Sequence, residues 1–413
     1  MFFANPNARR RDYDPALKSI MSIERGAESR RWLSHWHMLT PGATPLRALP
    51  GLAQRLSIGA LWMKDESLRS PLGSFKALGA PIALLRLVLR RWPAEGLRAQ
   101  ALLAGRHADL LKDFVVISAT DGNHGRALAA ASRSMGCRCV IVLHAHVSAE
   151  REAPIAALGA EIVRIAGNYD ASVQEAARLA EAHGWQVVSD TSYEGYEDIP
   201  RDVMQGYGII ADELLETAPM GGPCPYTHVV LQGGVGGLAA GVVSHFWERY
   251  GAARPSFIVV EPEQADCLLQ SARRGRASRA MGSVDSVMAG LACGEASPLA
   301  WRFLQPSIDV FMTVSDTDAV NAMRALATGD AGDVPVVSGE SGAAGLAALT
   351  VVAADPEAKR QAGLDASSRV LLLNTEGATA PALFQALTGL QPDDVRSAQA
   401  RWHVTPTIPA SSA

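Results

Sequence analysis

Short runs of apolar, often β-branched residues recur along this chain and are separated by alanine-rich stretches of helical periodicity. Most of the runs are continuously apolar, which is typical of strands that are covered on both faces. Strand–helix–strand repetition of this kind produces parallel sheets wrapped by helices. We therefore expect an α/β protein, with strands at residues 61–64, 114–119, 139–143, 161–165, 186–190, 228–232, 257–261, 310–314 and 370–373.

Helix signals follow several of the expected strands. The pattern predicts helices at 126–135 and 171–183. Another helix is expected to open at Ser148, with acidic residues in its first turn, and to close at Gly159. Four stretches lack clear periodicity and are expected to form arms, loops or linkers: about the first 35 residues, 94–106, 219–225 and the tail after Arg401.

Composition narrows the class of protein. The chain has 413 residues, 48% hydrophobic and 19% charged, as is ordinary for a globular protein of roughly two to three domains. A net charge of −4 gives no electrostatic reason to bind nucleic acid or an anionic membrane, and no run approaches the ~18–20 apolar residues that span a bilayer. The basic cluster at 9–11 follows the apolar start, the reverse of a secretory signal. Because the five cysteines show neither disulfide nor zinc spacing, we expect a cytoplasmic protein without a metal site.

A lysine stands at the entrance to an apolar segment in the stretch Gly73-Ser74-Phe75-Lys76-Ala77. The residues after Lys76 are mostly apolar and predict a helix. Burial there should depress the pKa of the lysine and leave a neutral amine that can attack an aldehyde. The alternative is a structural lysine that reaches solvent from the start of a helix.

The segment at 120–125 reads Thr-Asp-Gly-Asn-His-Gly and directly follows an expected strand. Small polar residues and glycines at such a turn leave backbone N–H groups free to bind a carboxylate. Asp121 and His124 add groups that can transfer protons. The alternative is an Asx turn that caps the next helix.

Two further segments end expected strands. The segment at 232–237 has four glycines, which let the backbone curl around a phosphate ahead of a helix. Its spacing does not match the dinucleotide fingerprint, and the chain has no Gly-x-x-x-x-Gly-Lys-Ser/Thr phosphate loop. In the segment at 373–377, a neutral hydrogen-bonding side chain could face a cofactor ring nitrogen. The alternative there is a polar strand end that runs into a helix.

The order of these four segments resembles the tryptophan-synthase-β-like, or fold type II, pyridoxal 5′-phosphate (PLP) enzymes. Among them the chain is similar to the diaminopropionate ammonia-lyases. The resemblance covers roughly residues 44–377. Supporting stretches lie at 61–67, 119–126, 190–196, 204–207, 288–295 and 339–345.

This resemblance implies two parallel-sheet domains wrapped by helices, with the active site between them. The large PLP-binding domain would comprise residues 1–85 and 195–413, and a small mobile α/β domain would comprise residues 86–194. Lys76 would hold PLP covalently, and Asn123 would meet its phenolic oxygen. The phosphate would be bound by the backbone of the glycine loop, and the pyridine nitrogen would face a residue at the strand end. The residues implied for these last two roles are Gly234, Val235, Gly236 and Gly237 for the phosphate, and Asn374 or Thr375 for the nitrogen.

The implied reaction is an α,β-elimination that converts 2,3-diaminopropionate, as the D or the L isomer, to pyruvate and ammonia. Lys76, Asp121 and Asp190 would be catalytic, and carboxylates suit a substrate whose β-substituent is an ammonium. Asp121 could also act as a base on the cofactor face opposite Lys76, which would let D-amino acids react. The implied protein is a homodimer with a small amino acid as its substrate. Substrate contacts are implied for Thr120, Asp121, Gly122 and His124.

Two alternatives remain open. One is a PLP-dependent dehydratase of a β-hydroxy amino acid such as serine or threonine. The other, from a different class, is a catalytically inactive small-molecule sensor on the same fold, although Lys76 is present. Cys267 and Cys293 lie in segments that match the lyases, and we predict that they are close enough to pair near the active-site entrance.

Overall fold

Two separate β-sheets organise the protein. The computed structural model describes residues 1–402 except 121, 146, 168, 217 and 220. The larger sheet has the strand order β1-β10-β9-β8-β11-β3-β2, with its five inner strands parallel and the edge strands β1 and β2 antiparallel to their neighbours. Its strands are β1 (Phe2–Ala4), β2 (Leu46–Ala48), β3 (Ala60–Asp65), β8 (His228–Gln232), β9 (Ser256–Pro262), β10 (Val310–Val314) and β11 (Arg369–Asn374).

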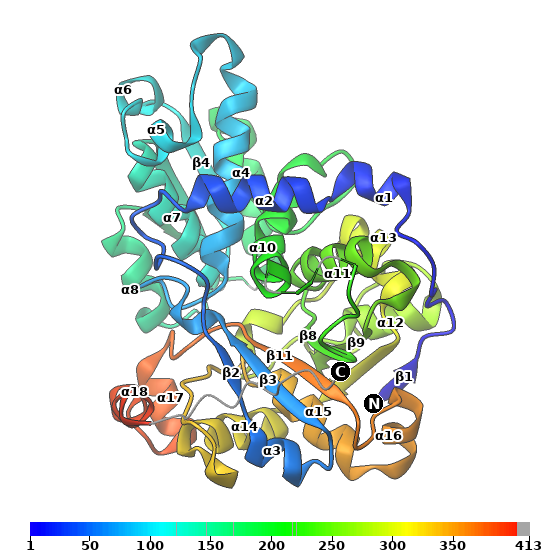
Figure 1. Ribbon diagram of the computed structural model, residues 1–413. Coiled ribbons are helices and arrows are strands. Elements are labelled where there is room, and N and C mark those ends of the chain that lie inside the picture. Colours follow the sequence, from blue (N-terminus) through cyan, green and yellow to red (C-terminus); the bar gives the residue numbers. More distant parts are fainter. Residues whose placement is uncertain (121, 146, 168, 217, 220, 403–413) are drawn as a thin grey trace.

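The smaller sheet is parallel throughout and has the strand order β6-β5-β4-β7. Its strands are β4 (Val115–Ala119), β5 (Arg138–Leu143), β6 (Glu161–Arg164) and β7 (Gln186–Val187). All four fall inside the segment 86–194 that was expected to form a small domain. They lie in one part of the molecule, at the upper left of Figure 1, with the helices α5 (Ala99–Leu103), α6 (Ala108–Leu111), α7 (Asn123–Met135) and α8 (Ala149–Ala157). The mobility of that part stays a prediction.

Helices cover both faces of each sheet. The long helices α4 (Lys76–Arg91) and α10 (Asp198–Glu216) pack tightly, because a Cβ on Gly206 would lie only 2.2 Å from the carbonyl oxygen of Leu78. The other helices are α1 (Pro15–Ile20), α2 (Ile23–Leu33), α3 (Pro50–Arg55), α5 (Ala99–Leu103), α6 (Ala108–Leu111), α7 (Asn123–Met135), α8 (Ala149–Ala157), α9 (Tyr169–His183), α11 (Gly237–Tyr250), α12 (Cys267–Arg274), α13 (Pro298–Ser307), α14 (Asp316–Thr328), α15 (Ala344–Ala354), α16 (Pro356–Ala362), α17 (Pro381–Thr388) and α18 (Pro392–Arg401).

One apolar core continues from sheet to sheet. Val116 and Ile141 on the smaller sheet belong to the same buried cluster as Val229 and Leu231 on the larger sheet, with α4, α7, α10 and α11 between them. The opposite faces have cores of their own, under α9 on the smaller sheet and under α14 and α15 on the larger one. The continuously apolar strands are therefore explained by burial on both faces.

All nine expected strands are confirmed, although the one expected at 186–190 ends at Val187. The expectation that about the first 35 residues lack structure is wrong, since this stretch holds β1, α1 and α2. Strand β1 gains its partner only by pairing with β10, some three hundred residues along the chain. The stretch 94–106, also expected as a loop, contains α5. The tail after Trp402 lies outside the described residues.

Within the described part of the chain, no helix combines the length and the apolar character needed to cross a bilayer. The same residues contain no group of three or more His, Cys, Asp or Glu side chains arranged to hold a metal ion.

Candidate active site

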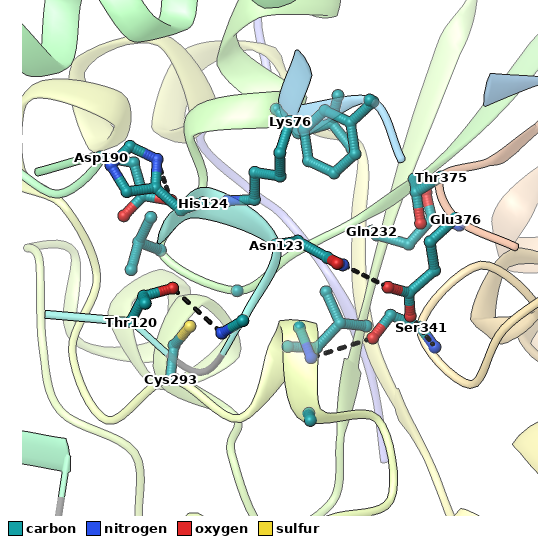
Figure 2. A pocket seen from close by; sticks show the side chains of 18 of the residues that line it. Lys76, Thr120, Asn123, His124, Asp190, Gln232, Cys293, Ser341, Thr375 and Glu376 are labelled. Carbon is teal, nitrogen blue, oxygen red and sulfur yellow. Dashed lines mark hydrogen bonds and ion pairs between the residues drawn. The ribbon is translucent and has the colours of Figure 1, made fainter. Parts of the chain in front are cut away.

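A cavity lies between the two sheets, beyond the carboxyl ends of β4, β8 and β11. This is where open parallel sheets place their ligands. Figure 2 shows side chains from both parts of the protein that converge on it. Its lining includes Lys76, Thr120, Gly122, Asn123, His124, Asp190, Tyr207, Gln232, Gly233, Gly234, Val235, Gly237, Cys293, Ser341, Thr375 and Glu376. The cavity thus brings together most of the residues that the sequence predicts.

Lys76 is the first residue of α4 and its side chain enters the cavity. The turn before it is tied to the end of β11, since the N–H of Phe75 donates to the carbonyl of Thr375 at 3.0 Å. The Nζ atom lies 2.5 Å from Oδ2 of Asp190 and within 5.3 and 5.7 Å of the ring centres of Phe75 and Tyr207. The predicted placement of Lys76 at the start of a buried helix is confirmed.

The prediction of a depressed pKa for Lys76 is wrong for this arrangement. Burial alone would lower the pKa of the lysine, but the negative charge and hydrogen bond of Asp190 outweigh it and raise the pKa well above its usual range. In the same pair, burial would raise the pKa of Asp190, and the charge of Lys76 lowers it instead. The sequence could not reveal this partner, because Asp190 is 114 residues away.

His124 also lies close to Asp190. Its Nε2 is 2.9 Å from the carbonyl oxygen of Val188, and its Nδ1 is 3.8 Å from Oδ2 of Asp190. Burial lowers the pKa of His124, so the neutral ring donates through Nε2 and turns the lone pair of Nδ1 towards Asp190 and Lys76.

The turn before α7 is organised by Thr120. Its hydroxyl oxygen accepts hydrogen bonds from the N–H groups of Gly122 and Gly125, at 3.0 and 3.2 Å. Gly122 has a φ of 147°, which L side chains rarely adopt. Asp121, predicted to be catalytic, lies outside the described residues.

The glycine loop is built so that only glycine fits at two of its positions. A Cβ on Gly233 would lie 2.6 Å from Cγ of Glu261, and one on Gly236 would lie 2.8 Å from Leu304. Gly236 also has a φ of 98° and precedes α11 directly. The loop therefore curls in front of a helix N-terminus, which favours a phosphate there. Gly236 itself does not border the cavity, unlike the other three predicted loop residues.

The end of β11 separates the two residues proposed for the ring nitrogen. Thr375 borders the cavity, whereas Asn374 does not. Asn374 is fully buried behind it, and its Nδ2 donates to Oδ1 of Asp65 at 2.9 Å and to the carbonyl of Val337 at 3.0 Å. Of the two, Thr375 is the one that can contact a ligand.

Four further cavity residues were not singled out from the sequence. Glu376 and Ser341 are hydrogen-bonded to each other on one wall, and Gln232 precedes the glycine loop. The ring of Tyr207 packs against that of Phe75 at a ring-centre distance of 4.7 Å. The signal for them was weak: each lies in a segment that matches the lyases, but no spacing within those segments marks it. Tertiary contacts alone distinguish these residues from their neighbours.

Cys267 and Cys293 both lie beside Gly234. The Cys267 thiol donates to the carbonyl of Gly234 at 3.3 Å, and Sγ of Cys293 lies 3.4 Å from where a Cβ of Gly234 would stand. Their predicted proximity is thus supported, while the structure has both as thiols rather than as a disulfide.

The chain is similar to known PLP-dependent enzymes. A family model described as pyridoxal-phosphate-dependent enzyme matches residues 38–376. The chain is also 37% identical to a diaminopropionate ammonia-lyase of Salmonella typhimurium, over 92% of this chain and 96% of that protein. The chain belongs to the diaminopropionate ammonia-lyase family of PLP-dependent enzymes.

Further known proteins and solved structures are similar to this chain. The Escherichia coli K12 lyase is 38% identical over 81% of this chain and 84% of its own. The crystal structure of the E. coli lyase in complex with an aminoacrylate–PLP azomethine reaction intermediate matches with a TM-score of 0.82, at 33% identity over 94% of this chain and 96% of that one. Tomato threonine deaminase isoform 2, at 20% identity and a TM-score of 0.69 over 94% and 98% of the chains, shares the fold. The fold is therefore the predicted fold type II.

The cavity fits PLP, the cofactor of this family. The loop at Gly234–Gly237 offers backbone N–H groups for a phosphate, and Lys76 offers an amine for the aldehyde. Two buried polar atoms at the cavity, Oε1 of Gln232 and the hydroxyl of Tyr207, have no hydrogen-bond partner within the described structure. Buried polar groups are nearly always paired, so a polar ligand is the expected partner.

Proposed function

We propose that this ammonia-lyase converts 2,3-diaminopropionate to pyruvate and two molecules of ammonia. The observation that carries the proposal is the ion pair of Lys76 and Asp190 inside the cavity. A buried carboxylate stabilises a neighbouring cation, and the β-substituent of diaminopropionate is an ammonium. The identity to curated diaminopropionate ammonia-lyases over most of the chain supports the same substrate.

The residues that would hold PLP come from both sheets. Lys76 would bind it covalently through Nζ, Asn123 would donate to its phenolic oxygen, and the backbone from Gly234 to Gly237 would bind its phosphate. Thr375 is the strand-end residue that would face the ring nitrogen. When bound, PLP supplies an electron sink for the electrons released at the α-carbon of an amino acid.

Three side chains of the protein would carry out the remaining steps. The amine of Lys76 would take the proton from the α-carbon of the substrate, because it is the one amine that borders the cavity among the described residues. Asp190 would hold the β-ammonium and stabilise its charge. The neutral ring of His124, with Nδ1 3.8 Å from Oδ2 of Asp190, would be able to accept a proton beside this pair.

The deciding experiment compares substrates. Purified enzyme with PLP should release pyruvate from diaminopropionate far faster than from serine, with two molecules of ammonia per pyruvate in place of one. Release of oxo acid from serine or threonine alone would favour the alternative, a dehydratase of β-hydroxy amino acids. One observation keeps that alternative in view: a structure of the E. coli lyase in complex with D-serine matches this chain with a TM-score of 0.84.

Activity on both isomers of diaminopropionate belongs to the same proposal. Lys76 can reach only one face of a planar substrate–cofactor system, so the second isomer requires a second base. Asp121 is the candidate from the sequence, and assays with the separate D and L isomers test it.

We further propose a cytoplasmic homodimer. The thiol state of all five cysteines supports a reducing compartment, and the dimer rests on the family resemblance. Light scattering of the purified protein would measure its mass in solution, and fractionation of the producing cells would test its location.

A further inference from the structure

The carboxylate of Glu376 makes two hydrogen bonds, and one of them joins the two sheets. Its Oε2 accepts from Nδ2 of Asn123, at the start of α7, and its Oε1 accepts from the backbone N–H of Ser341 at 3.1 Å. Glu376 itself follows β11 of the larger sheet, and Asn123 belongs to the part that carries the smaller one. Figure 2 draws the contact between Asn123 and Glu376 across the cavity wall.

The hydrogen bond with Glu376 determines which way the side-chain amide of Asn123 points. A carboxylate is only an acceptor, so the group that faces Glu376 must be the NH₂ of Asn123. An amide nitrogen carries two hydrogens, and only one is used by Glu376. The second N–H of Asn123 is left for a ligand in the cavity, which Asn123 borders.

Only a carboxylate of this length satisfies both donors. A glutamine at position 376 would offer a single oxygen, so its own NH₂ would have to face either Asn123 or the N–H of Ser341. The site has little room for rearrangement, because Glu376 is only 5% exposed and a Cβ on Gly339 would stand 2.9 Å from its Cγ.

A second buried acid, Glu340, lies next to Glu376. Burial, followed by the charge of Glu376, raises the pKa of Glu340 to about 7. Glu340 makes neither of the two hydrogen bonds described, and its nearest cation is Arg151, at 3.9 Å. Its carboxyl can therefore take up a proton without disturbing Asn123.

We propose that Glu376 is a positioning residue that fixes the amide of Asn123, so that an N–H donor meets the phenolic oxygen of PLP. The proposal rests on the cofactor contact proposed for Asn123, and it extends that contact across the two sheets. Glu376 acts through Asn123 and does not itself meet the reacting atoms.

The test is a double-mutant cycle on cofactor binding. We measure the dissociation constant of PLP and the absorption maximum of the bound cofactor for the wild type, E376Q, N123A and the double variant. E376Q should weaken PLP binding on the order of tenfold, since hydrogen bonds to charged groups are worth about 1.5–3 kcal/mol. It should also shift the absorption maximum. In the N123A background the same substitution should change the dissociation constant less than about twofold, because contacting residues couple.

E340Q is the matched control, since it removes a buried carboxylate beside Glu376 and leaves the bonds of Asn123 in place. Circular dichroism of each variant reports whether it folds. If E376Q does not fold, E376D replaces it, because it keeps the charge but is too short by one methylene to reach both donors. Equal losses in the wild-type and N123A backgrounds, or PLP binding unchanged by either substitution, would overturn the proposal. A wrong substrate would instead leave PLP binding intact and abolish only diaminopropionate turnover.

Discussion

Nζ of Lys76 lies 2.5 Å from Oδ2 of Asp190 in a cavity between the two sheets. Each group shifts the pKa of the other so that both are charged. Before Lys76 can act as a nucleophile, it has to leave this pair and lose a proton. The same carboxylate is then available to another cation, and the ammonium of a diamino acid has the charge that it requires.

Removing the charge of Asp190 should affect the two substrate classes differently. We expect D190N to lower kcat/KM for diaminopropionate on the order of 10²–10⁴-fold, as is typical of a positioned catalytic group. The loss with serine should be smaller, because its hydroxyl carries no charge. The measurement is kcat/KM for both substrates, with D330N, at an exposed partner of Arg55, as the control. Equal losses with both substrates would indicate that Asp190 interacts only with Lys76 and does not bind the β-ammonium.

Replacing Lys76 removes the covalent anchor. We expect K76A to have no measurable turnover and to lose the absorption band near 410–420 nm (approximate, as is usual for PLP bound to lysine). Its far-ultraviolet circular dichroism should be unchanged. The control is K112A, at an exposed lysine. Activity near that of the wild type in K76A would contradict the assignment.

Two adjacent glycines differ in whether their site can accept a side chain. G236A places a side chain at a φ of 98° and 2.8 Å from Leu304, and should destabilise the protein by about 2 kcal/mol. G237A meets its nearest atom, in Met204, at an ordinary 3.5 Å and should change stability by less than about 0.5 kcal/mol. Urea unfolding without PLP measures both. Similar values for the two variants would show that neither the φ of Gly236 nor the contact with Leu304 requires a glycine there.

Stability should fall as the pH rises towards 8. Burial raises the pKa of Glu261 from 4.5 to about 8, although the N–H groups of Leu268 and Leu269 donate to it. The folded protein therefore binds this proton more tightly than the unfolded chain. The stabilisation is complete below a pH of about 4.5 and is lost as the pH rises to about 8. In E261Q this slope should be reduced, as measured by urea unfolding at several pH values; an unchanged slope would assign the effect to other groups.

Asp121 should distinguish the two isomers of diaminopropionate. If it is the base on the face opposite Lys76, D121N should reduce kcat/KM for the D isomer on the order of 10²–10⁴-fold and affect the L isomer far less. Circular dichroism checks that the variant folds. Equal losses would indicate that Asp121 only binds substrate, and a wild type inactive on the D isomer would remove the second base and favour the hydroxy-amino-acid dehydratase.

Local patterns in the sequence determined much of this protein. Mostly apolar runs predicted the nine strands of the parallel sheets, because burial on both faces leaves few polar positions in most of them. The segments around Lys76, Asn123 and Gly234 could be recognised since each is contiguous in the chain, and the last two directly follow strands. The three-residue strands β1 and β2 were not predicted, because pairing with another strand, and not local preference, makes them strands.

Only the tertiary structure decided how the recognised segments meet. It paired Lys76 with Asp190 and so reversed the expected direction of its pKa shift. It placed Thr375 in the cavity and Asn374 behind it, and it joined Glu376 to Asn123 across 253 residues of chain. Charges and hydrogen bonds act through space over a few ångströms, so their partners depend on how the sheets are arranged and cannot be found from the spacing of residues along the chain.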